Sequence, residues 1–287
     1  VLPPEALAPA FEVPGRPGVQ SSFSPGAYQD AVRRVVEHIR AGDVFQVNLA
    51  QRLMARQTQG ALQTYGRLRE RNPAPFAGFF DARGAAVLSA SPERFLRADG
   101  DRIETRPIKG TRPRGRTGRE DQDLREELRS SEKDLAENVM IVDLLRNDLS
   151  RVCRLFSVEA PELFRVETYR TVHQLVSVVR GRLRQGLGPL DLLRAAFPGG
   201  SITGAPKIRA MEIIAALEPV ARGPYCGSLA WIGFDGSMDS SILIRTLTAA
   251  RGWLQLPAGG GITAPSDPEA EYVETLHKAE GMMLALE

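Results

Sequence analysis

Lysine is rare in this chain, and its rarity singles out Lys109 in the stretch RPIKGTRPRG. Of 37 basic residues only four are lysine, at positions 109, 133, 207 and 278, and the other 33 are arginine. A lysine can lose its proton and act as an amine nucleophile or base, whereas arginine is always charged. Survival by drift is the simpler explanation and suffices for Lys133, which we expect at an exposed helix start. For Lys109 and Lys278 the neighbouring residues favour a chemical role.

Two pairs of carboxylates have the spacing that puts both members on one face of a helix. Asp134 and Glu137 are three residues apart, and Glu271 and Glu274 repeat this spacing near the end of the chain. Apolar residues continue the first face, so we expect its acids to be partly buried. Two such pairs could hold Mg²⁺ if waters or substrate oxygens complete its octahedral shell. From spacing alone, solvated helix charge is the more economical interpretation, with Glu274 and Lys278 as a surface ion pair.

Three segments could bind an anion. Ser201 and Thr203 stand in a glycine-rich turn that enters a helix, where free backbone N–H groups suit a carboxylate or phosphate. The GGGI stretch at 259–262 would let the backbone approach a ligand closely, or simply form a turn. Arg245 is expected inside an apolar strand, where a charge is costly unless it is paired. Its partner could be a ligand carboxylate or, with about equal weight, a structural salt bridge.

Two further polar residues each have a chemical and a structural interpretation. His173, in TVHQLVSVV, is expected in a strand, where a hydrogen-bonded core histidine is the economical interpretation. Glu93, in SPERF, follows a predicted turn. It could be a general acid or only a charge at the start of a strand.

The composition is that of a globular protein and excludes several classes. The chain has 287 residues, 43% hydrophobic and 25% charged, with a net charge of +2. No polyanionic partner is indicated, and the basic stretch TRPRGRTGR lacks the interleaved aromatic residues of a nucleic-acid binder. No run of about 20 apolar residues exists, so no membrane span is expected. Cys153 and Cys226 have no CxxC spacing and indicate buried free thiols in a reducing compartment, so we expect a cytoplasmic protein.

Hydrophobic periodicity predicts the elements that must position these residues. Helices are expected at about 28–40, 60–71, 131–147, from 189, from Pro206 as the first helical position, and from Asp267. Strands are expected at about 43–56, four times between 76 and 108, at 152–159, 172–184, 225–234 and 240–250, with a further short strand leading into GGGI. Strand runs interrupted by helices predict an α+β fold with large, mostly antiparallel sheets. Residues 1–25 are rich in proline and indicate a linker, followed by one domain over 26–287.

Ten blocks, taken in order, resemble the chorismate-utilising enzymes. They are FQVNLAQR, SPERF, TRPIKGTRPRG, DLAENVMIVDLLRNDL, VHQLVS, PGGSITGAPKIRAMEII, GPYCGSL, IRTLTA, GGGI and EAEYVET. The resemblance runs from about Tyr28 to the C-terminus. It implies that the sheets pack as a sandwich with outer helices and that residues 26–287 form a chorismate-binding catalytic domain. Such chains usually carry an N-terminal half, which we expect to be absent here.

Lysine within PIKGT is typical of the aminodeoxychorismate synthase branch, component I, where anthranilate synthases typically have PIAGT. The resemblance implies that Lys109 attacks C2 of chorismate while the C4 hydroxyl leaves. Ammonia would then add at C4 and expel the lysine, giving 4-amino-4-deoxychorismate for para-aminobenzoate and folate biosynthesis. Glu93 would protonate the departing hydroxyl, and His173 would line the ring. Since free lysine titrates near pH ~10.4, we expect burial or nearby Arg106 and Arg112 to depress the pKa of Lys109.

The resemblance also implies a cofactor and a set of substrate contacts. Mg²⁺ would be held by Glu137 and Glu274, with Asp134 and Glu271 nearby. The expected substrate-binding residues are Gln46, Thr203, Tyr225, Arg245, Gly260, Gly261 and Lys278. Of these, Tyr225, Arg245 and the backbone at 260–261 would take the enolpyruvyl carboxylate. Gln46 stands where isochorismate and salicylate synthases have a lysine that activates water, which fits ammonia as the nucleophile here.

No segment resembles a glutamine amidotransferase, so ammonia from glutamine would come from a partner subunit. Two other functions remain open. The first is anthranilate synthase component I, which would give an aromatic product. The second is a non-catalytic chorismate-binding subunit, against which the combination of Glu93, Lys109, Glu137 and Glu274 argues.

Overall fold

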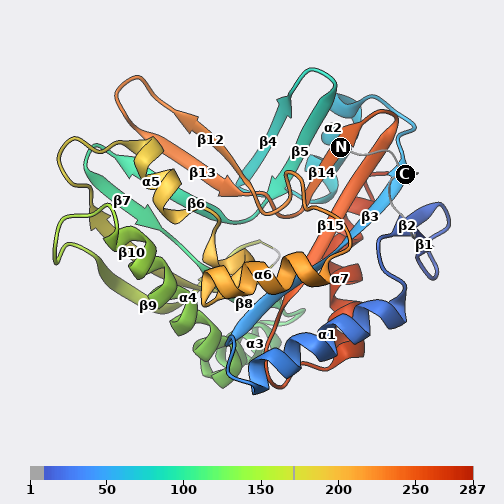
Figure 1. Cartoon of the computed structure of the whole chain (residues 1–287), viewed down its shortest axis with the longest axis horizontal. Coiled ribbons are helices and arrows are strands. Elements are labelled where there is room, and N and C mark those ends of the chain that lie inside the picture. The colour runs from blue at the N-terminus through green and yellow to red at the C-terminus, as the bar shows by residue number, and fades with distance from the viewer. Residues whose placement is uncertain (1–9, 171, 287) are drawn as a thin grey trace. The chain divides into compact units, whose positions relative to one another are not determined.

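A computed structural model describes residues 10–170 and 172–286. Within them the chain forms seven α-helices and two antiparallel sheets, and it divides into two compact units. The first unit comprises residues 1–92, 202–229 and 242–287, and the second comprises residues 93–201 and 230–241. Figure 1 labels the elements. The predicted α+β class with mostly antiparallel sheets is therefore confirmed.

The sheet of the first unit has β3 and β15 at its centre. Its strand order is β1–β2–β3–β15–β14–β5–β4, and β11 also pairs with β3. The bounds are Phe11–Glu12 (β1), Val19–Ser21 (β2), Gln46–Arg56 (β3), Phe76–Asp81 (β4), Ala85–Ser91 (β5), Gly204–Ala205 (β11), Thr246–Ala250 (β14) and Trp253–Ile262 (β15). The longest pairing joins β3 to β15 in one unbroken register, from Arg56 opposite Trp253 to Val47 opposite Ile262.

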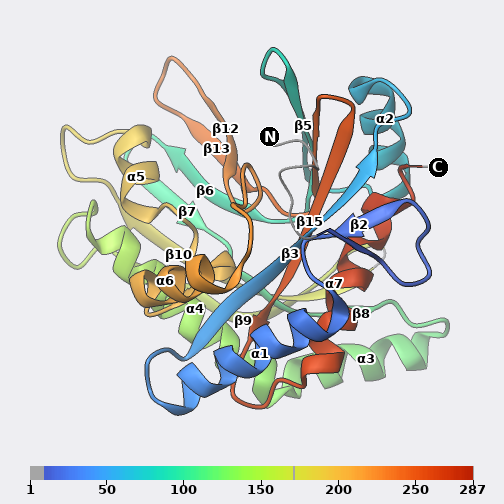
Figure 2. The ribbon, with the colours of Figure 1, turned by 45° about the vertical axis from the view of Figure 1, so that its right-hand side comes forward.

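Four helices belong to the first unit: α1 (Pro25–Arg40), α2 (Ala61–Arg71), α6 (Lys207–Leu217) and α7 (Pro268–Met283). Helix α1 begins where Ser24 accepts a hydrogen bond from the backbone N–H of Ala27, with proline at its first position. Helix α7 begins in the same way at Asp267. The two helices lie side by side (Figures 1 and 2), and the ring of Tyr28 is 5.9 Å from that of Tyr272.

The two faces of β3 have different chemistry because side chains alternate along a strand. Its odd-numbered residues other than Gln51 face apolar cores, where Leu53 packs with residues of β5, β14 and β15, and Leu49 with residues of α1 and α6. Its even-numbered residues include Gln46, Asn48 and Arg52, all buried. The polar face of this strand therefore carries side chains that need hydrogen-bond partners.

The sheet of the second unit has the order β12–β13–β6–β7–β10–β8, with β9 also on β10. The bounds are Arg94–Asp99 (β6), Arg102–Thr105 (β7), Ile108–Pro113 (β8), Glu159–Thr168 (β9), Val172–Arg182 (β10), Ser228–Ile232 (β12) and Met238–Ile242 (β13), the last two running into the first unit at one end. The helices are α3 (Gly118–Ser130), α4 (Glu132–Ser150) and α5 (Pro189–Ala196). On α4, Ile141 and Leu145 are buried and continue the face of Asp134 and Glu137, as predicted. None of the described helices is long and apolar enough to cross a membrane.

The structure corrects four sequence predictions. Helix α3 was not predicted, since only Leu128 of its thirteen residues is buried and it has no apolar stripe. The strand predicted at 152–159 is a turn region, and β9 starts at Glu159. The strand predicted at 240–250 ends at Ile242 and resumes at Thr246. Part of the predicted linker, residues 11–21, forms β1 and β2 instead, and β2 pairs with β3; residues 1–9 lie outside the described part.

Candidate active site

Lys109 lies on β8 in the second unit, beside α4. Its ammonium Nζ is 4.0 Å from Oε2 of Glu137, and the two side chains are only 14% and 17% exposed. The next residue, Gly110, has φ = 83°, and a Cβ there would come within 2.8 Å of both Asp134 and Leu128. Glycine at 110 thus lets β8 lie close against α4, which brings the predicted nucleophile next to a predicted metal ligand.

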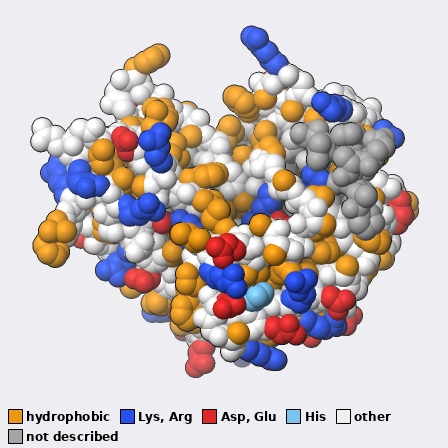
Figure 3. Space-filling view, in the orientation of Figure 1, with side chains coloured by type: hydrophobic (Ala, Val, Ile, Leu, Met, Phe, Trp, Pro, Cys, Tyr) orange, Lys and Arg blue, Asp and Glu red, His pale blue; other side chains and the backbone are white. Residues whose placement is uncertain are grey.

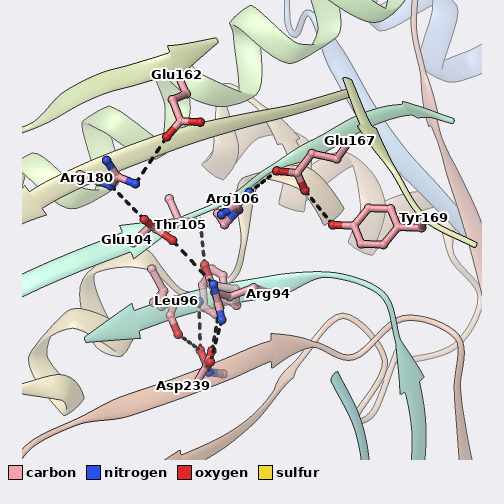
Figure 4. Close-up of polar contacts among 12 residues, drawn as sticks. Arg94, Leu96, Glu104, Thr105, Arg106, Glu162, Glu167, Tyr169, Arg180 and Asp239 are labelled. Atoms are coloured by element: carbon pink, nitrogen blue, oxygen red, sulfur yellow. Dashed lines mark hydrogen bonds and ion pairs between the residues drawn. The ribbon is translucent and has the colours of Figure 1, made fainter. Parts of the chain in front are cut away.

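The arginines expected to act on Lys109 are both paired with carboxylates. Arg106 forms an ion pair with Glu167 (Figure 4). Arg112 pairs with Glu127 at 2.9 Å and with Asp134 at 3.2 Å. Their charges are therefore largely offset, and they do not face the lysine as bare cations. The expectation that burial or these two charges depress the pKa of Lys109 stays a prediction.

Glu93, also in the second unit, is a buried carboxyl with 8% of its surface exposed. Burial raises its pKa to about 7, while the positive charge of Lys109 and a hydrogen bond from Ser201 act in the opposite direction. Ser201 Oγ donates this bond to Oε1 over 3.0 Å. A carboxyl that titrates near neutrality can hold a proton and deliver it, which is what a general acid requires.

Helix α4 supports this carboxyl as well as the lysine. A Cβ on Gly200 would come within 2.3 Å of Leu144 of α4, so the turn that carries Ser201 lies tightly against the helix. Leu144 is seven residues from Glu137 and therefore on nearly the same helix face. One face of α4 thus positions both Glu137 and the turn of Ser201.

His173 is buried on β10, with 1% of its surface exposed. Its Nε2 lies 3.0 Å from Oδ1 of Asp121 and its Nδ1 lies 2.9 Å from Oγ1 of Thr168. A hydrogen bond from Arg114 holds the pKa of Asp121 well below its usual range, so this carboxylate is ionised. It accepts a hydrogen bond from the Nε2–H of His173. Both ring nitrogens are engaged within the protein, as in a hydrogen-bonded core histidine. The role of His173 in lining a substrate ring stays a prediction.

In the first unit, the second carboxylate pair gathers over the backbone of Gly260. A Cβ at this position would lie 3.1 Å from Oε2 of Glu271, 3.6 Å from Oε1 of Glu274 and 3.5 Å from Nζ of Lys278. Nζ of Lys278 also donates to the carbonyl oxygen of Gly259 over 3.0 Å and pairs with Glu274 at 2.5 Å. The absence of a side chain at 260 therefore keeps open the space where these three charged groups meet.

Both carboxylate pairs have the donor chemistry of a magnesium site. Hard oxygen ligands suit Mg²⁺, and Glu271 is held in place by a hydrogen bond from Ser266 Oγ to its Oε1 over 2.6 Å. Among the described residues, no three acidic, histidine or cysteine side chains come together as a metal cluster. Each pair could thus contribute at most two direct ligands. Metal binding itself stays a prediction.

Gln46 and Gly261 of the first unit are in close contact across β3 and β15. A Cβ on Gly261 would come within 2.0 Å of Nε2 of Gln46, so only glycine fits there. Oε1 of Gln46 is buried and has no hydrogen-bond partner among the described residues, and the same holds for Nδ2 of Asn48. The backbone N–H of Asn48 is bound by the carbonyl of buried Thr203 over 2.8 Å. A buried acceptor without a donor is costly, which favours a ligand N–H or O–H at Gln46.

Arg245 lies between β13 and β14, not inside a strand, and its φ of 51° is in the left-handed region. Burial lowers the pKa of its guanidinium. No carboxylate of the described chain pairs with it, in contrast to Arg222 nearby, which pairs with Glu218 at 2.6 Å. Tyr225 is buried, and burial raises the pKa of its phenol. The structural salt bridge that the sequence left open for Arg245 is therefore not formed within the described chain.

Some functional neighbours were not predicted from the sequence. Asp121 belongs to the helix that periodicity missed, and Ser266 stands in a loop without a pattern. Ser201 was expected at an anion site, and its hydroxyl instead donates to Glu93. Charged side chains of both signs are interspersed on the face shown in Figure 3, which gives no support to a polyanion-binding surface.

The chain is similar to several known proteins. Residues 3–284 match the family model described as chorismate binding enzyme. Anthranilate synthase component 1 of Thermus thermophilus is 48% identical over 279 residues, which cover 97% of this chain and 60% of the relative. Aminodeoxychorismate synthase component 1 of Escherichia coli is 50% identical over 268 residues, which cover 93% and 59%. The chain thus spans about 60% of the length of these curated relatives.

Solved structures agree with the fold. Anthranilate synthase component I from Streptococcus pneumoniae superposes with a TM-score of 0.85 at 36% identity, covering 96% of this chain and 60% of that one. The menaquinone-specific isochorismate synthase from Escherichia coli gives 0.84 at 23% identity, covering 96% and 65%, and supports the fold alone.

Proposed function

The chain belongs to the chorismate binding enzyme family, and from this premise we propose that it converts chorismate and ammonia to 4-amino-4-deoxychorismate. The observation that carries the proposal is the surrounding of Lys109. A partly buried lysine lies beside Glu137. Its positive charge lowers the pKa of Glu93, a buried carboxyl whose pKa burial raises to about 7. An amine and a proton-donating acid within one unit are the two groups that a displacement with loss of a hydroxyl requires.

The proposed reaction has two displacement steps. In the first, the Lys109 amine forms a bond to ring carbon C2, both ring double bonds shift by one bond toward C4, and the C4–O bond breaks as Glu93 gives its proton to the leaving hydroxyl. Water departs. In the second, ammonia forms a bond to C4, both double bonds shift back, and the C2–N bond to Lys109 breaks. Excess protons pass from the added nitrogen to the carboxylate of Glu93, which restores the acid.

The first unit would supply substrate recognition. Arg245, whose guanidinium has no carboxylate partner within the described chain, would bind the enolpyruvyl carboxylate with Tyr225 and the backbone at 260–261. Gln46 would accept a hydrogen bond from the substrate or from ammonia at its orphaned Oε1. Thr203 and Lys278 would complete the contacts.

Mg²⁺ would be the cofactor, with Glu137 and Glu274 as ligands and Asp134 and Glu271 as neighbours. When bound, it would neutralise the ring carboxylate of chorismate. The carboxylates fit this assignment by donor type, because hard oxygen atoms are what Mg²⁺ prefers.

The ammonia source would be a partner subunit. The curated relatives are named component 1, which implies a further component, and we propose a glutamine amidotransferase in that role. The two free cysteines are buried, and we propose a reducing, cytoplasmic location on the path to para-aminobenzoate and folate.

A second candidate is anthranilate synthase component I, because a relative of that name matches 97% of the chain. Mass spectrometry of the products formed from chorismate, Mg²⁺ and ammonium separates the two. Our proposal expects 4-amino-4-deoxychorismate, which retains its enolpyruvyl group. Aromatic anthranilate with released pyruvate would instead establish the second candidate, and recovery of unchanged chorismate under saturating conditions would favour a non-catalytic chorismate-binding subunit.

A further inference from the structure

Arg52, on the polar face of β3, is a buried cation without a counter-ion in the described part of the chain. Its side chain is only 7% exposed, and Nε and Nη2 have no hydrogen-bond partner among the described residues. Burial lowers the pKa of its guanidinium, and no carboxylate opposes this effect. An uncompensated buried charge is among the most costly features a fold can contain.

Nε and Nη2, the two unpaired nitrogens of Arg52, are the atoms with which other arginines of this protein bind carboxylates. Arg94 uses Nε and Nη2 to hold Asp239, each over 3.0 Å (Figure 4). Arg114 holds Asp121 in the same way, over 2.7 and 2.9 Å. This side-on fork is a preferred geometry for a guanidinium and a carboxylate. Arg52 therefore offers the same fork, buried and empty of any protein acceptor.

A second buried donor belongs to a residue on the same face of the sheet. Gln255 of β15 is 3% exposed, and its Nε2 also has no partner. In the register of β3 and β15, Arg52 is opposite Pro257, and Gln255 is opposite Met54. The two side chains are thus diagonal neighbours on one face of the sheet, a separation that long side chains can bridge.

These donors are distinct from the residues of the proposed reaction. Arg52 is six residues from Gln46 along a continuous strand, which corresponds to roughly 20 Å, and four residues from Asn48, the partner of Gly261, which corresponds to roughly 13 Å. None of the catalytic, substrate-binding or metal-binding residues proposed above belongs to this part of β3 or β15.

We propose that Arg52 and Gln255 form a second binding site that takes a carboxylate. The carboxylate accepts two hydrogen bonds from Nε and Nη2 of Arg52 and a third from Nε2 of Gln255. It neutralises the buried cation and satisfies all three orphaned donors. A free organic acid and an acidic side chain of another polypeptide share this chemistry, and the experiment separates them.

The test is the thermal midpoint of the chain in increasing acetate or in increasing triglutamate, with ionic strength held constant by chloride. For the wild type we expect a saturable rise, of about 5 °C at a concentration one hundred times the dissociation constant. Arg52→Met should abolish the rise, and Gln255→Leu should raise, at least tenfold, the acid concentration at which half of the rise is reached. A free acid as the natural ligand predicts a response to acetate, whereas an acidic side chain predicts a response to triglutamate at concentrations where acetate has none.

Two variants serve as matched controls. Arg56→Met removes another arginine from β3, one whose guanidinium stacks on Trp253, and should leave the carboxylate response unchanged. Arg222→Met removes a buried arginine that is already paired, and should lower the midpoint in chloride. Arg52→Met in chloride should not lower it, because the charge it removes has no partner.

The proposal is overturned if wild type and Arg52→Met respond alike to both acids, or if neither responds. It is also overturned if Arg52→Met loses as much stability in chloride as Arg222→Met does, since Arg52 would then already have a partner.

Discussion

The ammonium of Lys109 and the carboxylate of Glu137 are ion-paired neighbours, 4.0 Å apart, on β8 and α4 of the same unit. The proposed nucleophile is therefore in contact with a proposed magnesium ligand. Gly110 makes this possible, because any Cβ there would collide with Asp134 and Leu128. Changes at Glu137 should consequently affect both metal dependence and the chemistry at Lys109.

We predict that Glu137→Gln and Glu274→Gln each raise the Mg²⁺ concentration needed for half-maximal turnover by roughly 10- to 100-fold. The reason is the loss of one anionic oxygen ligand without a change of shape. Turnover of chorismate with ammonium, titrated with Mg²⁺, is the measurement. Glu132→Gln and Glu269→Gln, exposed acids on the same two helices, are the controls. Wild-type activity of either test variant at limiting Mg²⁺ contradicts the assignment.

Turnover should fall as the pH rises through about 7, because Glu93 must be protonated to act as the general acid and burial raises its pKa to about 7. Glu93→Gln should lower kcat by roughly 10²- to 10⁴-fold and remove this alkaline limb. The measurement is the pH profile of kcat/KM between 5.5 and 9. A wild-type profile that stays flat through neutrality would rule out this role.

The same carboxyl should leave a signature in stability. Its pKa is raised in the folded state from the ordinary 4.5, so the folded chain holds the proton more tightly than the unfolded chain. The stabilisation is complete below pH 4.5 and is lost as the pH rises to about 7. Urea unfolding of wild type and Glu93→Gln across this window should show a decline present only in the wild type. Parallel curves for the two proteins would contradict it.

Ser201 should act as a positioning residue for Glu93. Its hydroxyl stabilises the ionised carboxylate, so Ser201→Ala should raise the pKa of Glu93 and move the alkaline limb of the pH profile upward. Ser201→Thr keeps the hydroxyl and should restore the profile. Ser150→Ala, an exposed serine at the end of α4, is the control. If Ser201→Ala changes only stability and not the pH profile, its role is structural.

Arg245→Lys keeps the positive charge but loses the planar fork. We predict a rise in KM for chorismate of at least tenfold, with kcat changed less. Arg251→Lys is a matched control, since this exposed arginine also has a positive φ, of 50°. Equal KM values for wild type and Arg245→Lys would mean that Arg245 does not hold the substrate carboxylate.

Elements with a regular apolar pattern could be predicted from the sequence, and those shaped by polar contacts could not. Helix α1 has valines at helical spacing after a serine cap, and α7 has an Asp-Pro start. By contrast, α3 packs through Leu128 and is held by Arg114 and Asp121, a signal that periodicity does not carry. The break at Arg245 follows from a left-handed backbone that an apolar stretch conceals.

The candidate site divides in the same way. Residue types and helical spacing indicated the acids of α4 and α7, and the structure confirms that the α4 pair shares a half-buried face. The contact of Lys109 with Glu137, the tether of Ser201 to Glu93 and the burial of Arg52 depend on pairings between distant segments. Such pairings are fixed by tertiary packing, which a single sequence does not display.

The central claim is that Lys109 becomes covalently attached to the substrate ring. The most direct measurement is incubation of the wild type with chorismate and Mg²⁺ but without ammonia, followed by trapping, digestion and mass spectrometry. We expect added mass, equal to chorismate less water, on the peptide that contains Lys109. We also expect that Lys109→Ala and Lys109→Arg both bind chorismate but lose most aminodeoxychorismate formation, because neither has a nucleophilic amine. Wild-type turnover in Lys109→Arg, or normal turnover with ammonia and no trapped adduct, would contradict the account and point to direct attack of ammonia on the ring.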